Sequence, residues 1–338
     1  MKIAFVLMKY DYGVKERGFS YEYFNVLIPA EDVFGKENIV LFDFLSEYKN
    51  YGKAKMNSLL YDFIKSEKPD VTVFCLFKNE IDENTVLKLK GMTNTVCYFI
   101  DDPWRQEFAR HWIKYFDYFS TPDFYMLKQY QSEGFKQVIY SPFGFNSSIY
   151  TKKDLPLKYD VSFVGGFSAL RKWIFNLLAK EGIKVNIFGR GWAGNKSWLS
   201  IEEMVNVFNQ SRINLNLSNA SSYDMNFLFY SLRAAHSIKN IIRTKKNREQ
   251  VKGRHYEING CGAFQLSYFV PGLNIAYEID KEIAVFDNPY NLADQIKYFL
   301  KNDDHRLTIA NAGYERSLKE HTAQSYIKNL CESAFKGI

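Results

Sequence analysis

The stretch Tyr159-Asp160-Val161-Ser162-Phe163-Val164-Gly165-Gly166 decides the fold, because it starts a new series of strands and helices in the middle of the chain. Its apolar residues predict a buried strand, and the two glycines predict a tight turn at the end of that strand. Residues 169–181 then have helical spacing, and Gly182 ends that segment. A strand, a glycine turn and a helix in this order indicate the first part of a parallel sheet.

The first half of the chain has the same alternation. Short apolar runs separated by helical stretches, such as 51–67 and 123–134, predict a parallel sheet covered by helices on both faces. Pro142 closes this half, and residues 147–158 are polar and aperiodic, which indicates a connector. The runs predicted as strands are 2–8, 38–44, 70–77, 95–100, 118–120 and 137–141.

The second half continues with further strands and helices. Ser200 and Glu203 have the spacing of a capping box and predict a helix start. At 338 residues the chain exceeds the size of about 250–300 at which one core stops growing, so two domains are expected. The sequence thus predicts an α/β protein with two Rossmann-like domains facing a cleft. The segments predicted as strands are 184–188, 212–218, 266–270 and 282–286, and those predicted as helical are 292–300 and 303–334.

The composition is that of an ordinary globular protein, with 46% apolar and 24% charged residues. A net charge of +6 fits an anionic substrate, a membrane surface or neither. No run approaches the roughly 20 apolar residues of a membrane span, so any membrane role is expected to be peripheral, at the inner face. The four cysteines, Cys75, Cys97, Cys261 and Cys331, lack metal-ligand spacing and indicate reduced thiols in a cytoplasmic protein.

The stretch Gly253-Arg254-His255-Tyr256-Glu257-Ile258-Asn259-Gly260-Cys261-Gly262 carries the strongest functional signal. Arg254 and Glu257 are three residues apart, so on a helix they point to the same side. A cation for phosphate beside a carboxylate for sugar hydroxyls suits a site for an activated sugar nucleotide. The alternative is a surface ion pair followed by a capping glycine.

Five ordered blocks of the second half resemble the CgeB-like (spore maturation protein-like) glycosyltransferases, a branch of the GT-B class. This resemblance implies a GT-B fold and metal-independent transfer from a nucleotide sugar that the second domain binds. It also implies domains at 1–150 and 159–315 and a last helix, 316–338, that crosses back to the first domain. The blocks are VSFVGG (161–166), IFGRGW (187–192), RINLNLS (212–218), KGRHYEINGCGAFQL (252–266) and IANAGYERSLKEHT (309–322), and YFIDDPWR (98–105) adds a weaker block in the first half.

The donor site is assigned to residues of the second domain. Glu257 is expected to accept hydrogen bonds from the ribose hydroxyls, and Arg254 and Lys252 to meet the diphosphate at a helix N-terminus. Arg190 is a second candidate phosphate cation, or else an ordinary turn cation. Glycines that clear room for the ligand, or that simply make tight turns, are Gly165, Gly166 and Gly262.

Glu249 and Glu257 have seven residues between them, a spacing found in many retaining GT-B enzymes. Glu249, however, lies in a basic loop that lacks the usual glycines, so only Glu257 is given a role. Whether the anomeric centre is retained or inverted stays open at this point.

Asp101 and Asp102 follow an apolar run and are expected at the carboxyl edge of the first sheet, where ligands of such sheets bind. Either could be the catalytic base for an acceptor hydroxyl or could position the donor sugar. The alternative is a cap on the following helix. Two adjacent aspartates without a third ligand are poor Mg²⁺ or Mn²⁺ holders, so neither a metal nor a cofactor is expected.

Two other classes of protein were weighed. A Rossmann enzyme that modifies sugar nucleotides is disfavoured because the first turn, Met8-Lys9-Tyr10-Asp11-Tyr12-Gly13, is not GxGxxG. A nucleic-acid-binding or non-catalytic sugar-binding module lacks any matching motif, and no nucleic-acid partner is expected. The acceptor is a glycan, a lipid-linked glycan or a protein, and the oligomeric state stays open. Aromatics that could stack on its sugar rings, or belong to the core, are Tyr10, Tyr12, Tyr21, Tyr23 and Trp104.

Overall fold

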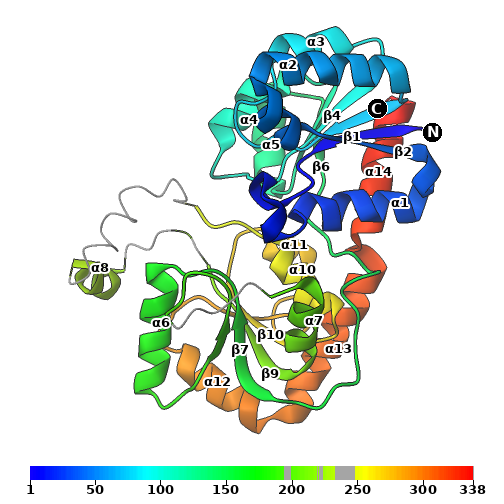
Figure 1. Ribbon diagram of the computed structural model, residues 1–338. Coiled ribbons are helices and arrows are strands. Elements are labelled where there is room, and N and C mark those ends of the chain that lie inside the picture. Colours follow the sequence, from blue (N-terminus) through cyan, green and yellow to red (C-terminus); the bar gives the residue numbers. More distant parts are fainter. Residues whose placement is uncertain (194–198, 219, 221–223, 233–247, 338) are drawn as a thin grey trace. The chain divides into compact units, whose positions relative to one another are not determined.

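A computed structural model describes residues 1–193, 199–218, 220, 224–232 and 248–337 (Figure 1). The chain divides into two compact units, each with its own parallel sheet. Unit 1 comprises Met1–Asn146 and Thr322–Ile338, and unit 2 comprises Ser147–His321. No helix among the described residues combines the length and apolar character that a membrane crossing needs.

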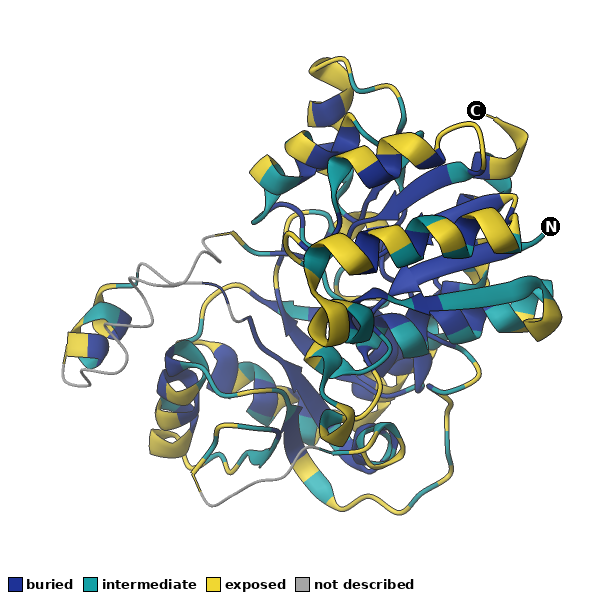
Figure 2. Ribbon diagram, turned by 45° about the horizontal axis from the view of Figure 1, so that its top comes forward, coloured by how far each residue is buried: buried dark blue, intermediate teal, exposed yellow. Residues whose placement is uncertain are grey.

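Unit 1 contains a six-stranded parallel sheet in the order β2-β1-β3-β4-β5-β6. Ile3 pairs with Ile39 on one side and with Val71 on the other, so β1 is central and fully buried. Figure 2 shows the strands of this sheet largely buried and the outer faces of its helices exposed. The strands are β1 (Ile3–Leu7), β2 (Ile39–Asp43), β3 (Val71–Phe74), β4 (Asn94–Tyr98), β5 (Tyr118–Thr121) and β6 (Val138–Tyr140).

The last helix of the chain belongs to unit 1. In α14, Ile327 and Leu330 are buried in the same cluster as Phe5 and Val73, and α14 lies beside α1 (Figure 1). The expected helix 316–338 therefore starts later. Helix α13 ends before His321, and the Thr322 hydroxyl caps the new helix α14 by accepting a hydrogen bond from the Ser325 amide. The helices of unit 1 are α1 (Ile28–Phe34), α2 (Phe44–Glu67), α3 (Glu83–Leu89), α4 (Gln106–Ile113), α5 (Phe124–Ser132) and α14 (Ala323–Lys336).

Unit 2 contains a five-stranded parallel sheet in the order β11-β10-β9-β7-β8. The chain starts at β7, adds β8 on one side and then crosses to β9 on the other, so the winding direction reverses between β7 and β9. Ligands of such sheets bind outside the carboxyl ends of the strands at this reversal. The strands are β7 (Tyr159–Val164), β8 (Asn186–Phe188), β9 (Ser211–Asn216), β10 (Gln265–Tyr268) and β11 (Ala284–Phe286).

The helices of unit 2 cover both faces of its sheet (Figure 1). The predicted capping box is confirmed, since Ser200 and Glu203 exchange backbone-to-side-chain hydrogen bonds of 2.7 and 3.2 Å at the start of α7. The helices are α6 (Ala169–Lys180), α7 (Ile201–Asn209), α8 (Met225–Leu232), α10 (Gly253–Gly260), α11 (Leu273–Ala276), α12 (Leu292–Lys301) and α13 (Asp303–Glu320).

The two faces of the second sheet differ in chemistry. Along each strand side chains alternate between faces, and the apolar set packs with residues of α6 and α12 in one core cluster. The opposite face is polar yet almost completely buried, and it contacts α7 and α10 through hydrogen bonds. Its members, aligned across three strands by the register, are Ser162, Asn214, Asn216, Gln265 and Ser267.

Candidate functional site

The glycine turns after β7 and β8 lie side by side at the carboxyl edge of the second sheet. The Gly165 amide donates to Phe188 O at 2.9 Å, and the Phe167 amide donates to Arg190 O at 2.9 Å. The structure therefore brings together three predicted site residues, Gly165, Gly166 and Arg190, next to the strand reversal.

The two predicted glycines differ in what surrounds them. A Cβ on Gly165 would lie 2.7 Å from the Phe163 ring, whereas one on Gly166 would meet nothing closer than Arg190 O at 3.9 Å. Gly165 is thus required for packing, and its part in ligand binding stays a prediction. Gly166 keeps the open space that a ligand group would need.

Arg171 links the ends of two strands at this edge, and it was not predicted as a site residue from the sequence. Its guanidinium donates to the carbonyls of Gly166 (2.8 Å), Leu217 (2.8 Å) and Ser218 (3.0 Å), at the ends of β7 and β9. Burial lowers the pKa of Arg171 to about 10, and the charge of Arg254 adds to this effect. One signal was available, because a cation in the first turn of a helix is disfavoured by the helix dipole and needs another reason to be there.

Glu249, which had no role predicted from the sequence, also lies at this edge. Its carboxylate accepts a hydrogen bond from Ser218 Oγ. Burial raises its pKa, and the bond from Ser218 with the charges of Lys252 and Arg171 opposes that increase. The structure thus brings Glu249, the first residue of the E-x7-E spacing, to the same edge of the sheet as the end of β9. Ser218 and Glu249 border a cavity of about 580 Å³, whose other lining residues include Trp173, Tyr268, Asp287 and Tyr290.

Arg254 and Glu257 pair with each other on α10. An ion pair of 2.6 Å joins their side chains. The Arg254 side chain is 27% exposed and the Glu257 side chain is 6% exposed. The prediction that they share one side of a helix is confirmed. The alternative, a surface ion pair, describes the pairing of Arg254 with Glu257 but not its environment, because the Glu257 carboxylate is buried.

The His255 side chain, in the first turn of α10, caps the N-terminus of that helix. His255 Nδ1 accepts from the amide of Lys252 at 3.0 Å, and burial lowers the pKa of His255 to about 3, so the ring is neutral. Gln265 on the polar sheet face donates to His255 O at 2.7 Å and to Asn259 Oδ1 at 2.6 Å. These bonds fix the first turn of α10, which carries Lys252 and Arg254.

Gly262 lies away from these residues. It follows the C-terminal end of α10 with φ of 64°, and a Cβ there would lie 2.7 Å from Lys152 Cδ. It also precedes β10, so it is at the amino edge of the sheet, opposite to the edge where Gly166 and Lys252 lie. The predicted role of Gly262 in ligand binding is corrected to a turn that packs on the connector.

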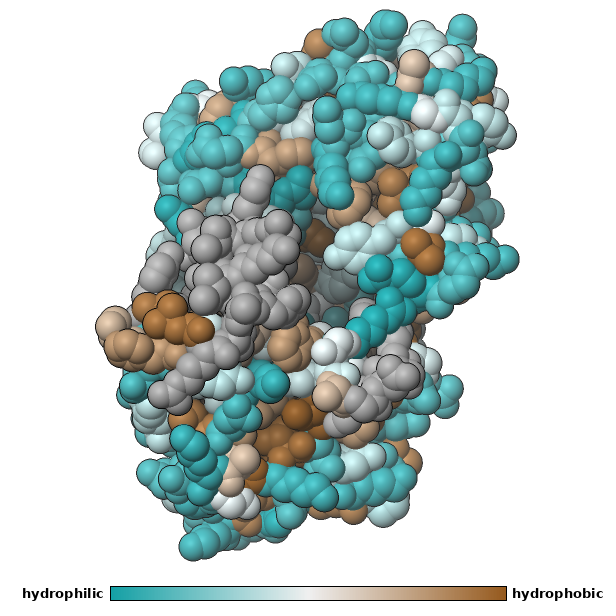
Figure 3. All heavy atoms as spheres, turned by 60° about the vertical axis from the view of Figure 1, so that its left-hand side comes forward, coloured by the Kyte–Doolittle hydropathy of each residue, from teal (hydrophilic) through white to brown (hydrophobic). Residues whose placement is uncertain are grey.

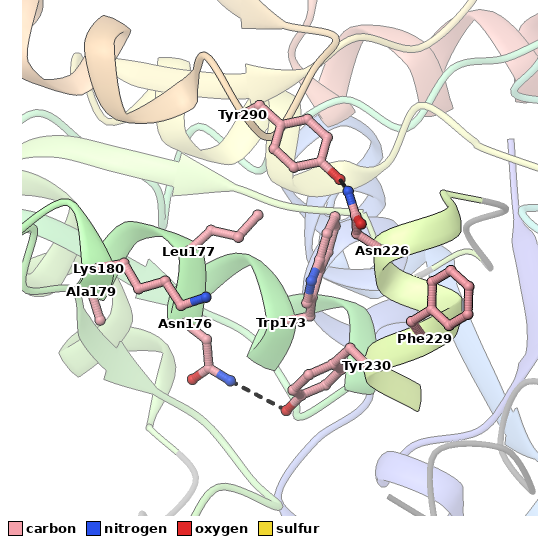
Figure 4. A pocket seen from close by; sticks show the side chains of 9 residues that line it. All are labelled: Trp173, Asn176, Leu177, Ala179, Lys180, Asn226, Phe229, Tyr230 and Tyr290. Carbon is pink, nitrogen blue, oxygen red and sulfur yellow. Dashed lines mark hydrogen bonds between the residues drawn. The ribbon is translucent and has the colours of Figure 1, made fainter. Parts of the chain in front are cut away.

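A second cavity, of about 780 Å³, lies between α6 and α8 and shares Trp173 and Tyr290 with the first (Figure 4). Its polar atoms bond to one another, with Asn226 Nδ2 donating to the Tyr290 hydroxyl at 2.7 Å. Figure 3 shows apolar side chains gathered on the face of unit 2 that carries α8. Phe229 of α8, 58% exposed, contributes to this apolar surface.

The two candidate catalytic carboxylates of unit 1 have different surroundings. Asp101 is partly exposed and forms an ion pair of 2.8 Å with Arg105. Asp102 is fully buried and accepts from the Thr121 hydroxyl at 2.8 Å and the Tyr130 hydroxyl at 2.7 Å. Both hydroxyls enclose Asp102, which is the environment of a structural carboxylate, and its catalytic role stays a prediction.

The burial of Asp102 predicts a pH-dependent stability. Burial raises its pKa from 3.8 to about 7, so between these values the folded protein holds a proton that the unfolded chain has lost. The free energy of unfolding should therefore fall as pH rises through this window. Asp102→Asn cannot titrate, so its melting temperature should rise relative to wild type between pH 4 and pH 8.

The control for this experiment is Asp62→Asn, which changes an exposed aspartate on α2. Thermal melts of the three proteins at several pH values give the comparison. A constant offset between Asp102→Asn and wild type at every pH would contradict the prediction.

Comparisons with known proteins agree with this geometry. Residues 171–332 match the family model described as glycosyl transferase-like, and the match begins at Arg171. A comparison with curated proteins finds no match.

Solved structures with the same fold cover nearly the whole chain. HepE of Anabaena in complex with UDP-glucose is 10% identical, with 98% of this chain and 99% of that chain covered and a TM-score of 0.64. Sucrose-phosphate synthase from Thermosynechococcus elongatus is 10% identical, with 98% of each chain covered and a TM-score of 0.65. A glycosyltransferase from Rickettsia africae is 13% identical over 99% of this chain and 98% of that chain, with a TM-score of 0.59.

The structural comparison tests the predicted fold, and the family comparison tests the predicted class of enzyme. The structural likeness confirms the predicted GT-B fold, and the family match confirms the predicted class of enzyme, a glycosyltransferase. Residues 171–332 thus match the glycosyl transferase-like family, and the whole chain has the GT-B fold.

Proposed function

We propose that this chain transfers a sugar from a nucleoside-diphosphate sugar, bound by unit 2, to a hydroxyl group of an acceptor held by unit 1. The observation that carries the proposal is the gathering of charges at the strand reversal of unit 2. Arg171 interacts electrostatically with both Arg254 and Glu249, and Lys252 interacts with Glu249. Three cations around two carboxylates, Glu249 and Glu257, match a ligand that carries both phosphates and hydroxyl groups.

Each group has a chemical role in this proposal. Lys252 and Arg254 at the start of α10 meet the diphosphate, where helix amides and side-chain cations both favour negative charge. Their charge stabilises the leaving diphosphate as the glycosidic bond breaks. Glu257 and Glu249 accept hydrogen bonds from ribose or sugar hydroxyls. Arg190, beside Gly166, is assigned to the same phosphates.

A buried donor at the end of β9 supports a ligand at this edge. Asn216 is 6% exposed, and its Nδ2 has no hydrogen-bond partner among the described residues. An unsatisfied buried donor costs stability, so such a group is usually completed by water or by a ligand. An oxygen of a bound nucleotide sugar would satisfy it.

The solved relatives support the choice of donor. HepE of Anabaena has been crystallised with UDP and with UDP-glucose, and it shares the fold of this chain. We also propose that the chain belongs to the CgeB-like branch, which the blocks quoted from the sequence support. We further propose that transfer needs no metal, so it should survive EDTA, whereas a loss restored by Mn²⁺ would contradict this part.

Calorimetric titration tests the donor site. The wild type should bind one of UDP, GDP or dTDP and should not bind NAD or a short oligonucleotide. Glu257→Ala should weaken that binding about 10–150-fold, because it removes hydrogen bonds to a charged acceptor worth roughly 1.5–3 kcal/mol. The control is Glu278→Ala, which removes an exposed carboxylate of unit 2. Equal affinity for both variants would refute the assignment of Glu257.

A further inference from the structure

Helix α8 has one side that packs on unit 2 and one side that is exposed. On the packed side, Phe227 and Ser231 are buried, and the centroid of the Phe227 ring lies 5.6 Å from that of Trp173 on α6. Asn176 of α6 also donates to the Tyr230 hydroxyl at 3.3 Å. The contacts with α6 therefore account for one side of α8 and leave the opposite side to be explained.

The outer face of α8 consists of Met225, Phe229 and Leu232. These residues are four and three positions apart, so their side chains share one side of the helix. Their exposed fractions are 62%, 58% and 64%, and those of Met225 and Leu232 are the highest among the large apolar side chains of the described residues. Single exposed apolar residues are common, but three on one helix face form a patch that marks an interaction surface. Figure 3 shows apolar side chains gathered on this part of unit 2.

The sequence that follows α8 supplies the charge that such a surface would need. Residues 225–248 include six lysines and arginines and no aspartate or glutamate. The first of these cations directly follows the last residue of α8, so the positive charge is tethered to this helix. Arg248 is exposed, and the other five lie outside the described residues. The six are Arg233, Lys239, Arg243, Lys245, Lys246 and Arg248.

Exposed apolar side chains beside cations, without acidic residues, are typical of a segment that lies on an anionic membrane. Lys180 of α6 adds an exposed cation, which lines the same cavity as Phe229 (Figure 4). Tyr290 is exposed and accepts a hydrogen bond from Asn226 of α8, and tyrosine is enriched where membrane meets water. Because α8 has eight residues and a span needs about 20, the contact would be at the membrane surface.

A nucleic acid fits this surface less well than a lipid does. Nucleic acids bind cations together with aromatic rings on which bases stack. Met225 and Leu232 offer no ring, and they have the largest exposed fractions of the outer face. Aliphatic side chains that are left in water gain most by inserting below lipid headgroups.

We propose that the outer face of α8 binds the surface of an anionic membrane. Met225, Phe229 and Leu232 insert between the headgroups, and the cations tethered to the helix meet the lipid phosphates. None of these three side chains lines the cavity at Glu249, so the proposal does not depend on the proposed function.

Co-sedimentation with vesicles tests the proposal. One set of vesicles contains phosphatidylcholine and phosphatidylglycerol in equal parts, and the other contains phosphatidylcholine alone. At about 0.1 M salt the wild type should sediment with the anionic vesicles and stay in solution with the neutral ones. Raising the salt to about 1 M should release most of the protein, because the screening length falls from about 10 to about 3 Å.

Two pairs of variants separate the apolar contribution from other effects. Phe229→Ser combined with Leu232→Ser should weaken vesicle binding about tenfold or more, because two inserting side chains are lost. Both side chains are exposed, so the melting temperature should stay at the wild-type value. The control is Leu307→Ser combined with Leu318→Ser, which removes two exposed leucines of α13 and should bind vesicles as the wild type does.

A second comparison tests the charges. Lys180→Gln combined with Arg248→Gln should weaken binding to anionic vesicles about 10–30-fold. The control is Lys301→Gln combined with Lys319→Gln, which removes two exposed cations from other helices of unit 2 and should have little effect.

Three results would overturn the proposal. The first is a wild type that does not sediment with anionic vesicles, and the second is equal binding to both kinds of vesicle. The third is a dimer, seen by analytical ultracentrifugation, that Phe229→Ser with Leu232→Ser dissociates, because it would assign the outer face of α8 to a second copy of the chain. A protein that binds UDP but no vesicles would keep the proposed function and lose only this inference.

Discussion

Arg171→Met should destabilise unit 2. The guanidinium satisfies the carbonyls of Gly166, Leu217 and Ser218, and methionine has no donor to replace it. Leu217 and Ser218 are buried, and a buried acceptor left without its partner costs about 1–3 kcal/mol, so these two carbonyls should cost about 2 kcal/mol or more. For a unit of this size that corresponds to a fall in melting temperature of roughly 4–8 °C.

Donor binding should weaken as well, because Arg171 holds the turn of Gly166 against the end of β9. The control is Lys172→Met, which removes an exposed cation from the next position on α6. Differential scanning calorimetry and titration with UDP measure the two effects. If Arg171→Met melts with Lys172→Met, the three hydrogen bonds do not contribute to stability.

Gly189→Ala should prevent the two glycine turns from packing together. Gly189 has a φ of 128°, which side chains rarely adopt, and a Cβ there would collide with the carbonyl of Gly165. The Cβ position is fixed by the backbone of residue 189, and the atom it meets is also backbone, so no rotamer change can relieve the clash. We expect a loss of several kcal/mol, shown by a low melting temperature or by protein recovered only in aggregates.

Gly166→Ala is the matched variant for this experiment. Its Cβ would have ordinary clearance and no strained φ, so the fold should tolerate it. If Gly166 leaves room for the ligand, Gly166→Ala should keep the wild-type melting temperature and yet bind UDP more weakly. Wild-type affinity would show that Gly166 only shapes the turn.

Much of the fold follows from local sequence patterns. The buried strands are continuous apolar runs, and the Ser200–Glu203 box marks a helix start with two hydrogen bonds that depend on four residues only. The helix expected over 51–67 begins earlier, at Phe44, because Asp43 accepts from the Ser46 amide and caps it. Gly52 kinks this helix, which hid its first two turns from a periodicity analysis.

The site was harder to predict because burial and partners come from distant segments. The pairing of Arg254 with Glu257 depends on helical spacing alone and was predicted correctly. Glu249 is bound by Ser218, 31 positions away, and Asp102 is enclosed by Tyr130, 28 positions away. A single sequence contains no signal for such contacts, so the accessible and the enclosed aspartate of one pair looked alike.

The position of α14 has a consequence for how the protein is made. Ile327, Leu330, Cys331 and Ala334 complete the core of unit 1, but they are synthesised after the whole of unit 2. Because chains emerge from the ribosome with the N-terminus first, unit 2 can finish folding while one face of the first sheet still lacks its cover. During that interval β3 and β4, which α14 contacts, expose an apolar surface, and this is the part of the nascent chain that a chaperone would have to shield.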